Sequence, residues 1–231
     1  MKDNSDYNRG SSRPRVGVVG GGQLALMLVN AAKNREVEIA VQSALSNDPA
    51  AIKANHLSLA EPSNPLGTKE LLNFCDCITF ENEWVNIEEL NKLEEQGAKF
   101  LPQIAALSCL VNKVSQRKLL DQLQLPSPRW IPLSSNKISF SKLPLGWTFP
   151  LMAKVASGGY DGKGTKVIKS FNDFNNLLES VNRDEWLLEE WVSYERELAL
   201  VVSRDAKGQV KTFPISETFQ SDQICNWVLA P

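Results

Sequence analysis

The sequence predicts an α/β protein of two domains, and three observations point to that fold class. The chain has 231 residues, of which 42% are apolar and 23% charged, as in an average globular protein. Over the first hundred residues, short β-branched runs alternate with segments of helical periodicity. Beyond Pro102 the strand-like runs follow one another with few helices. We therefore expect a parallel, doubly wound sheet followed by an α+β domain.

The first of these domains is predicted to span residues 14–107. Residues 1–13 are polar and lack apolar periodicity, so we expect them to form a disordered leader. Gly97 follows the last helical pattern as a C-terminal cap. The predicted strands are 16–19, 37–41 and 77–80, and the predicted helices are 24–32, 69–74 and 87–96.

The second domain is predicted to span residues 108–231. Apolar periodicity predicts helices at 103–110 and 113–123, the first of them at the boundary, and Ser170 caps a further helix at 171–181. A short turn at 205–208 indicates that strands here pair antiparallel. The predicted strands are 130–133, 151–155, 166–168, 186–191, 197–203 and 210–215.

Charge and hydropathy exclude several classes of protein. The net charge of −2 argues against a protein that binds nucleic acid or a membrane surface. The longest apolar run, 24–29, is too short to span a membrane, and the first fifteen residues lack the apolar segment of a secretory signal. We therefore expect a cytoplasmic protein. The four cysteines are interpreted as core thiols and the single histidine, His56, as a loop or surface residue.

A glycine-rich turn, Gly20-x-Gly22-x-x-Ala25, lies between a predicted strand and a predicted helix, as in a Rossmann-like nucleotide-binding unit. A dinucleotide site also needs an acidic residue at the tip of the second strand, where this chain has Gln42 and Ser43. Two interpretations are favoured over dinucleotide binding. The glycines permit close packing of strand and helix, or the helix N-terminus holds a substrate phosphate.

A second glycine-rich segment reads Gly158-Gly159-Tyr160-Asp161-Gly162-Lys163-Gly164. Glycines let a backbone present successive N–H groups to phosphate oxygens, and a lysine adds positive charge. Lys154 ends the preceding strand and is placed to reach the same phosphates. An ordinary glycine-rich hairpin is the alternative interpretation, and the length and charge of the loop favour phosphate binding.

Acidic residues follow two other predicted strands. Glu189 and Glu190 end an apolar strand whose free amide and carbonyl groups could bind an adenine ring, and Glu197 could accept hydrogen bonds from a ribose. Glu81 and Glu83 follow the strand 77–80, at the edge where open α/β sheets bind ligands. The two residues fit the start of the next helix equally well.

The order of these features resembles the nucleotide site of the ATP-grasp superfamily. More narrowly, the sequence resembles the N5-carboxyaminoimidazole ribonucleotide synthase family within it. The resemblance spans nearly the whole ordered chain, and the segment 158–164 is its most specific part. It rests also on Val18-Val19-Gly20-Gly21-Gly22-Gln23-Leu24, on Asn112-Lys113-x-x-Gln116 and on Leu125-Pro126-Ser127-Pro128.

The resemblance implies a role for each matching residue. Lys113 and Lys154 would contact the phosphates of ATP, Glu197 would hold the ribose, and Gln220, commonly histidine in relatives, would lie near the nucleotide. The implied phosphate flap comprises Gly159, Tyr160, Asp161, Gly162, Lys163, Gly164 and Thr165, and the implied adenine site comprises Glu189, Glu190, Trp191 and Val192. The implied contacts to the aminoimidazole ribonucleotide are Gly22, Gln23, Leu24, Glu81, Glu83 and Tyr160.

By the same resemblance, ATP would phosphorylate bicarbonate to carboxyphosphate, which carboxylates 5-aminoimidazole ribonucleotide in a Mg²⁺-dependent, homodimeric enzyme. The family's metal ligands lie downstream of the position of Pro231, so we expect a truncated ATP-grasp domain that binds nucleotide weakly and turns over poorly. Three alternatives stay open: another ATP-grasp carboxylase or ligase, a nucleotide-binding module without catalysis, and a nicotinamide-dependent dehydrogenase.

Overall fold

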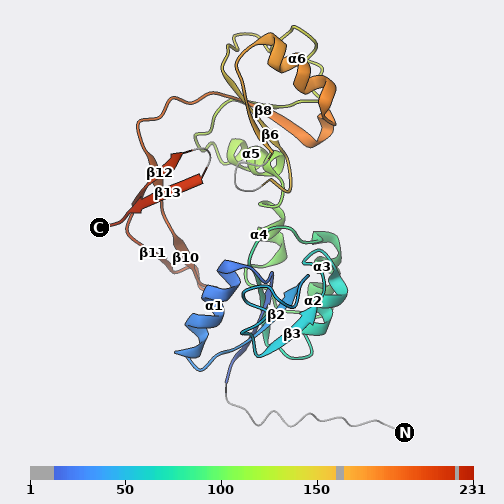
Figure 1. The fold of residues 1–231 in the computed structure, drawn as a ribbon, viewed down its shortest axis with the longest axis vertical. Coiled ribbons are helices and arrows are strands. Elements are labelled where there is room, and N and C mark those ends of the chain that lie inside the picture. Colours follow the sequence, from blue (N-terminus) through green and yellow to red (C-terminus); the bar gives the residue numbers. More distant parts are fainter. Residues whose placement is uncertain (1–12, 160–163, 222–223) are drawn as a thin grey trace. The chain divides into compact units, whose positions relative to one another are not determined.

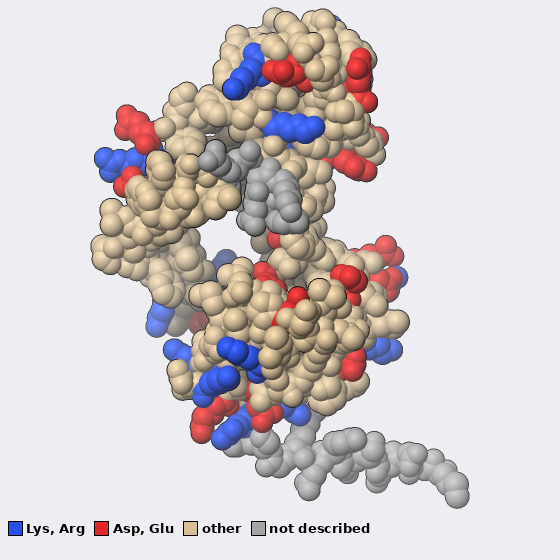
Figure 2. Space-filling model, viewed as in Figure 1, with Lys and Arg blue, Asp and Glu red and all other residues tan. Residues whose placement is uncertain are grey.

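The computed structural model describes residues 13–159, 164–221 and 224–231 (Figure 1). The chain separates into two compact units, one ending at Val111 and the other beginning at Asn112. The boundary that the sequence suggests, between 107 and 108, stays a prediction. No helix in the described ranges is both long enough and apolar enough to cross a membrane. On the face seen in Figure 2, cationic and anionic side chains are interspersed over both units.

The first unit is built on a parallel sheet with the strand order β3-β2-β1-β4. Its strands are β1 (Arg15–Val19), β2 (Glu38–Ser43), β3 (His56–Leu59) and β4 (Cys77–Phe80). Strand β3 was not predicted from the sequence. The interpretation of His56 as a loop residue was wrong, because His56 begins this strand. Its side chain is 30% exposed, and its ring stacks on Phe74, with centroids 3.6 Å apart.

Helices cover both faces of this sheet, as the sequence pattern predicted (Figure 1). The neighbouring residues Val18 and Val19 are fully buried but belong to different hydrophobic clusters, because successive side chains of a strand point to opposite faces. Helix α1 (Gln23–Lys33) packs with Val18. The cluster around Val19 takes side chains from α2 (Pro65–Leu71), α3 (Ile87–Glu95) and α4 (Ile104–Ser108).

Helix α2 begins four residues before the predicted segment 69–74. Pro65 occupies its first turn, where a missing N–H costs nothing, and the side chain of Asn64 accepts a hydrogen bond from the Leu66 amide at 3.0 Å. Apolar periodicity alone could not locate this start. The Asn-Pro pair was the available signal.

The second unit contains an antiparallel sheet with the strand order β5-β8-β6-β7. Its strands are β5 (Trp130–Pro132), β6 (Leu151–Val155), β7 (Thr165–Ile168) and β8 (Trp186–Glu190). Helix α6 (Phe171–Ser180), capped by Ser170, packs Phe174 and Leu177 into the core of one face. The helix α5 (Lys113–Gln122) and the short 3₁₀ helix η1 (Arg183–Glu185) complete this part.

The rest of the second unit consists of two small antiparallel sheets. One pairs β10 (Val202–Arg204) with β11 (Val210–Thr212) across the predicted turn at 205–208, and the other has the order β13-β12-β9. The predicted strand 197–203 is therefore two strands, with β9 at Glu197–Ala199. Strands β12 (Ser216–Ser221) and β13 (Ile224–Leu229) were not predicted. The prediction of four core thiols fails for Cys225 on β13, which is exposed.

Candidate functional site

A buried glutamate on β8 lies between two cations. Glu189 and Lys154 are diagonal neighbours on adjacent strands, and Lys154 Nζ lies 2.7 Å from Glu189 Oε2. Arg117, on α5, donates from Nε to the other oxygen, Oε1, at 2.6 Å. The Glu189 side chain is 3% exposed, against 20% for Arg117 and 26% for Lys154. We call these three residues the Glu189 cluster.

The charge of Glu189 is stabilised by its partners against the effect of burial. Burial by itself raises the pKa of this carboxyl group, but the hydrogen bonds from Arg117 and Lys154 outweigh it, so that the pKa is lowered from its usual 4.5. The group is thus ionised at neutral pH. With two cations and one anion, the cluster carries a net charge of about +1.

Local structure fixes α5, which carries Arg117, against the end of β6. The Asn112 side chain caps the helix by accepting hydrogen bonds from the amides of Val114 and Ser115 at 2.9 and 3.2 Å. The Lys113 amide donates to the Ala156 carbonyl, just beyond β6, at 2.7 Å. The helix start therefore has a fixed place beside the strand that carries Lys154. Lys113 is half-buried and forms no ion pair with any residue in the described ranges.

The glycine-rich segment connects β6 to β7, so the alternative of a hairpin describes its two ends correctly. Lys154 pairs with Thr165 across the two strands. Gly158 and Gly164 have φ of +76° and +80°, a backbone region that other residues rarely adopt. A Cβ on Gly164 would lie 2.3 Å from a methyl carbon of Val155. The predicted flap residues Tyr160, Asp161, Gly162 and Lys163 lie outside the described residues.

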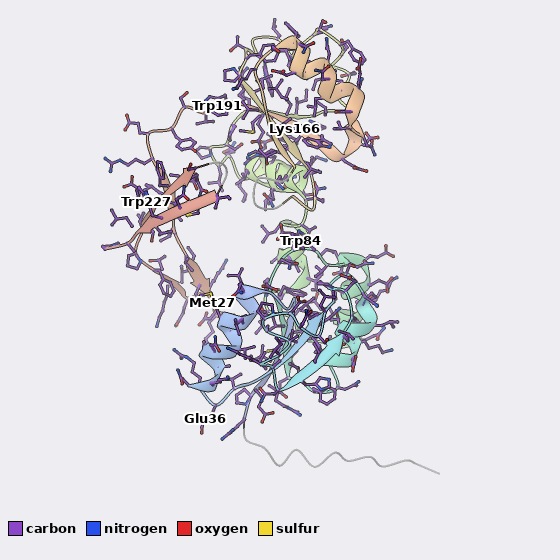
Figure 3. The ribbon with its side chains drawn as sticks, in the orientation of Figure 1. Met27, Glu36, Trp84, Lys166, Trp191 and Trp227 are labelled. Carbon is purple, nitrogen blue, oxygen red and sulfur yellow. The ribbon has the colours of Figure 1, made fainter. Side chains whose placement is uncertain are left out.

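The predicted adenine-binding residues lie at the end of β8. Pairing within the sheet ends at Glu190, which forms an ion pair with Arg129. Trp191, labelled in Figure 3, and Val192 follow the strand. Their side chains are 43% and 48% exposed. Within the described part of the chain, the main-chain groups of Trp191 and Val192 form no backbone hydrogen bond. The carboxylate of Glu189, in contrast, is bound by its two cations.

Glu197 and Gln220 are brought together in the sheet β13-β12-β9. Glu197 Oε1 accepts hydrogen bonds from Thr218 Oγ1 at 3.0 Å and from Gln220 Nε2 at 3.2 Å. The family resemblance implies that both residues lie near the nucleotide. Because they are hydrogen-bonded to each other, they form one polar group.

In the first unit, the glycine-rich turn encloses a carboxylate of the chain itself. Glu81, directly after β4, accepts hydrogen bonds from the amides of Gly22 at 2.7 Å, Leu24 at 3.1 Å and Ala25 at 3.3 Å. A Cβ on Gly20 or on Gly22 would lie 2.5 Å from a Glu81 oxygen. The glycines therefore permit close approach of Glu81, and these helix N-terminal amides bind its carboxylate in the place of a phosphate.

The other predicted ribonucleotide contacts lie around this turn. Gln23 and Leu24 are exposed at the start of α1. Glu83 is half-buried, and in the described part of the chain only Glu81 of the two carboxylates is bonded to the turn. Neither residue begins the next helix, because α3 starts at Ile87 with Asn86 as its cap.

The tip of β2, where a dinucleotide site requires an acidic residue, is a structural anchor. Gln42 is fully buried, donates from Nε2 to the carbonyls of Glu61 at 2.6 Å and Asn64 at 2.9 Å, and accepts from Thr68 Oγ1 at 2.7 Å. Every polar group of the side chain is used to hold the segment that starts α2. It therefore offers no group to a ribose.

Comparison with known proteins assigns the chain to a family. Residues 14–111 match the model of the ribonucleotide synthetase preATP-grasp domain, and residues 118–231 match that of the ATP-grasp domain. The chain belongs to the ATP-grasp superfamily. The two matched segments lie within the two units of this ATP-grasp chain, which divide between Val111 and Asn112.

Individual relatives agree with this assignment. The chain is 42% identical over 217 residues to a protein of Synechococcus elongatus named N5-carboxyaminoimidazole ribonucleotide synthase, a match covering 94% of this chain and 54% of the relative. A carboxyaminoimidazole ribonucleotide synthase of Aspergillus clavatus complexed with ATP has a TM-score of 0.83 at 28% identity, covering 94% and 56%. Its complex with ADP and 5-aminoimidazole ribonucleotide gives 0.80 at 27%, with the same coverage. The chain thus spans about half the length of these relatives.

Sequence reasoning missed one member of the Glu189 cluster, Arg117. A signal for it existed, because Arg117 lies four residues after Lys113 on a predicted helix, a spacing that places both side chains on one face. No spacing could reveal its partner, which lies 72 residues further along the chain.

The described residues do not include a set of magnesium ligands. Within these ranges, no group of three or more His, Cys, Asp or Glu side chains could hold a metal ion. The Glu189 cluster can instead bind and orient an anion, because it combines net positive charge with low exposure.

Proposed function

We propose that the chain provides the nucleotide-binding and ribonucleotide-binding residues of an enzyme that carboxylates 5-aminoimidazole ribonucleotide with bicarbonate and ATP. The products are N5-carboxyaminoimidazole ribonucleotide, ADP and phosphate, a step of de novo purine biosynthesis. The observation that carries this proposal is the 42% identity, over 94% of the chain, to a relative named for that synthase.

The Glu189 cluster supports a nucleotide site in the second unit. We propose that Lys154 and Lys113 bind the phosphates, and that Gly159–Thr165 close over them as a flap. The main chain at the end of β8, through Glu190, Trp191 and Val192, would bind the adenine, since the Glu189 side chain is engaged by Arg117 and Lys154. The polar pair of Glu197 and Gln220 would bind the ribose.

The chemistry proposed for this site is two successive transfers. A bicarbonate oxygen attacks the γ-phosphorus of ATP, which forms carboxyphosphate and releases ADP. The amine of the ribonucleotide then attacks the carboxyl carbon, phosphate leaves, and the amine loses its proton. The lysines would offset the negative charge on the transferred phosphoryl group, and a closed flap would exclude water, which hydrolyses an acyl phosphate.

The first unit supplies the proposed ribonucleotide site, at the turn that encloses Glu81. Gln23 and Leu24 are exposed beside this carboxylate, and Gly22 leaves the space for it. Glu81 and Glu83 are anionic, so they suit the amine and hydroxyl donors of the ribonucleotide better than its phosphate. Tyr160 is the further proposed contact.

The remaining expectations belong to the same proposal. We expect the enzyme to need Mg²⁺, which supplies charge neutralisation at transferring phosphates in this chemistry, and to act as a cytoplasmic homodimer. Among the described residues, no cluster of His, Cys, Asp or Glu side chains could hold the metal ion.

Release of ADP tests the proposal. An enzyme of the relatives' full length that carries this sequence should release ADP in a reaction that requires both 5-aminoimidazole ribonucleotide and bicarbonate, followed with a coupled assay. The Lys154→Ala variant should lose this release, whereas Lys166→Ala should keep it. Lys166 is a matched control because it lies on the neighbouring strand, opposite Ala153, and so points to the other face of the sheet from Lys154.

Two results would contradict the proposal. ADP release that follows another acceptor would assign the chain to a different ATP-grasp carboxylase or ligase. ATP binding without any release would identify a nucleotide-binding module.

A further inference from the structure

The Glu189 cluster contains a second cation, Arg117, besides Lys154, the lysine that is proposed to bind phosphates. Arg117 and Lys154 each bind a different oxygen of Glu189, at 2.6 and 2.7 Å. The two contacts divide the carboxylate between the helix α5 and the strand β6. Neither cation alone therefore satisfies the buried anion.

Arg117 determines how much of the charge of Lys154 is available to a ligand. In a pair of Lys154 and Glu189 alone, the charges would cancel, and a carboxylate next to incoming phosphates would repel them. With Arg117 present the cluster keeps a net charge of about +1. Glu189 then serves to hold Lys154 in place without neutralising the site.

The geometry of Arg117 suits it to this task. Its Nε donates to Glu189, and the guanidinium is planar and stays protonated, so the contact is directional. The capping contacts of Asn112 and the bond from the Lys113 amide to Ala156 fix the helix that carries Arg117 to the end of β6. The arginine and the lysine are thus held by one rigid part of the molecule.

We propose that Arg117 is a positioning residue for the ATP site: by binding one oxygen of Glu189, it orients that carboxylate and leaves Lys154 the net positive charge that the phosphates of ATP require. This inference rests on the proposed nucleotide site and adds a residue that does not itself touch the nucleotide.

Four versions of the full chain test the proposal by charge. The net charge of the cluster is about +1 in the wild type, 0 in Arg117→Gln, +2 in Glu189→Gln and +1 in the double variant. By calorimetric titration with ATP, Arg117→Gln should bind at least about tenfold more weakly than the wild type, a loss of about 1.4 kcal/mol. The double variant should return to within about threefold of the wild type, and Glu189→Gln should bind at least as tightly.

Adenosine and two further variants separate positioning from a structural role. Adenosine has no phosphates, so its affinity, measured by competition, should not differ between the wild type and Arg117→Gln. Arg117→Lys keeps the charge and should restore most of the affinity for ATP. Lys166→Gln is the matched control, since Lys166 lies opposite Ala153 on the neighbouring strand β7, on the other face of the sheet from Lys154, and should leave ATP binding unchanged.

The outcomes are distinct. Wild-type protein that gives no heat with ATP overturns the proposed function and the role of Arg117 with it. Wild-type binding together with equal binding by Arg117→Gln, or a double variant as weak as Arg117→Gln, overturns the positioning role alone. Equal losses of ATP and adenosine affinity in Arg117→Gln would show a structural effect and would also overturn it.

Discussion

Glu81 in the first unit and Glu189 in the second are carboxylates held inside candidate sites by different kinds of partner. Glu81 is bound by backbone amides at the start of α1, which carry partial charges and are present with any residue except proline. Glu189 is bound by two side-chain cations. The first arrangement places an anionic group in the proposed ribonucleotide site, and the second gives the proposed nucleotide site a net positive charge. Similar residues thus give sites of opposite charge.

Removal of each carboxylate should have the largest effect and should separate the two sites. Glu189→Ala leaves two cations side by side, so we expect a loss of about 3 kcal/mol in the free energy of unfolding of the second unit, the lower end for a broken buried pair. Glu81→Ala removes a helix cap, and a loss of about 1–2 kcal/mol is expected in the first unit. Hydrogen exchange followed by peptide reports each unit separately. Equal losses would contradict the comparison.

The substitution Gly22→Ala tests whether this position needs a glycine because Glu81 approaches it closely. Gly22 has an ordinary φ of −80°, so Gly22→Ala introduces no backbone strain, only a contact of 2.5 Å with Glu81. We expect a loss of about 1–3 kcal/mol in the free energy of unfolding. In the Glu81→Ala background the same substitution should cost almost nothing. A cost that persists there would show that another neighbour demands the glycine.

The cap of α5 tests whether the second site depends on helix placement. Asn112→Ala removes the acceptor for two amides and should lower the free energy of unfolding by about 1 kcal/mol. The loss should appear in hydrogen exchange of the second unit and leave the first unchanged. A loss shared by both units would mean that the two sites are not independent.

Acid should reduce the contribution of Glu189 to the free energy of unfolding, because the carboxylate becomes protonated. This is the smallest of the expected effects, since Glu189 stays ionised at neutral pH. Because the pKa of Glu189 is lower in the folded chain than its usual 4.5, its charge stabilises the fold above that pH, and the stabilisation is lost as the pH falls through the folded value. The difference in unfolding free energy between wild type and Glu189→Gln should be constant from pH 7 to about 5 and narrow below it. Urea unfolding across this range measures it, and a difference that grows in acid would refute the lowered pKa.

The sequence predicted the parts of both sites that depend on local pattern. The predicted strand, glycine turn and helix around Gly20–Gly22 are present in the structure. The predicted strands on either side of the second glycine-rich segment, the first of which carries Lys154, are present as well. The strand β3 was missed, because four residues that begin with a histidine show no apolar run. The partners of the carboxylates were also missed, since Glu81 and Gly22 are 59 positions apart. Long-range contacts of this kind have no signature in a single sequence.

The side-chain amide of Gln42 is fully hydrogen-bonded, and this limits how the first unit could be re-engineered. Gln42→Asp would install the acidic residue typical of nicotinamide-binding sheets, but it would remove the donors that hold the carbonyls of Glu61 and Asn64. A buried carboxylate would then face two carbonyl oxygens. Changing the ligand preference of this sheet would therefore require a redesign of the entry into α2 together with the strand tip.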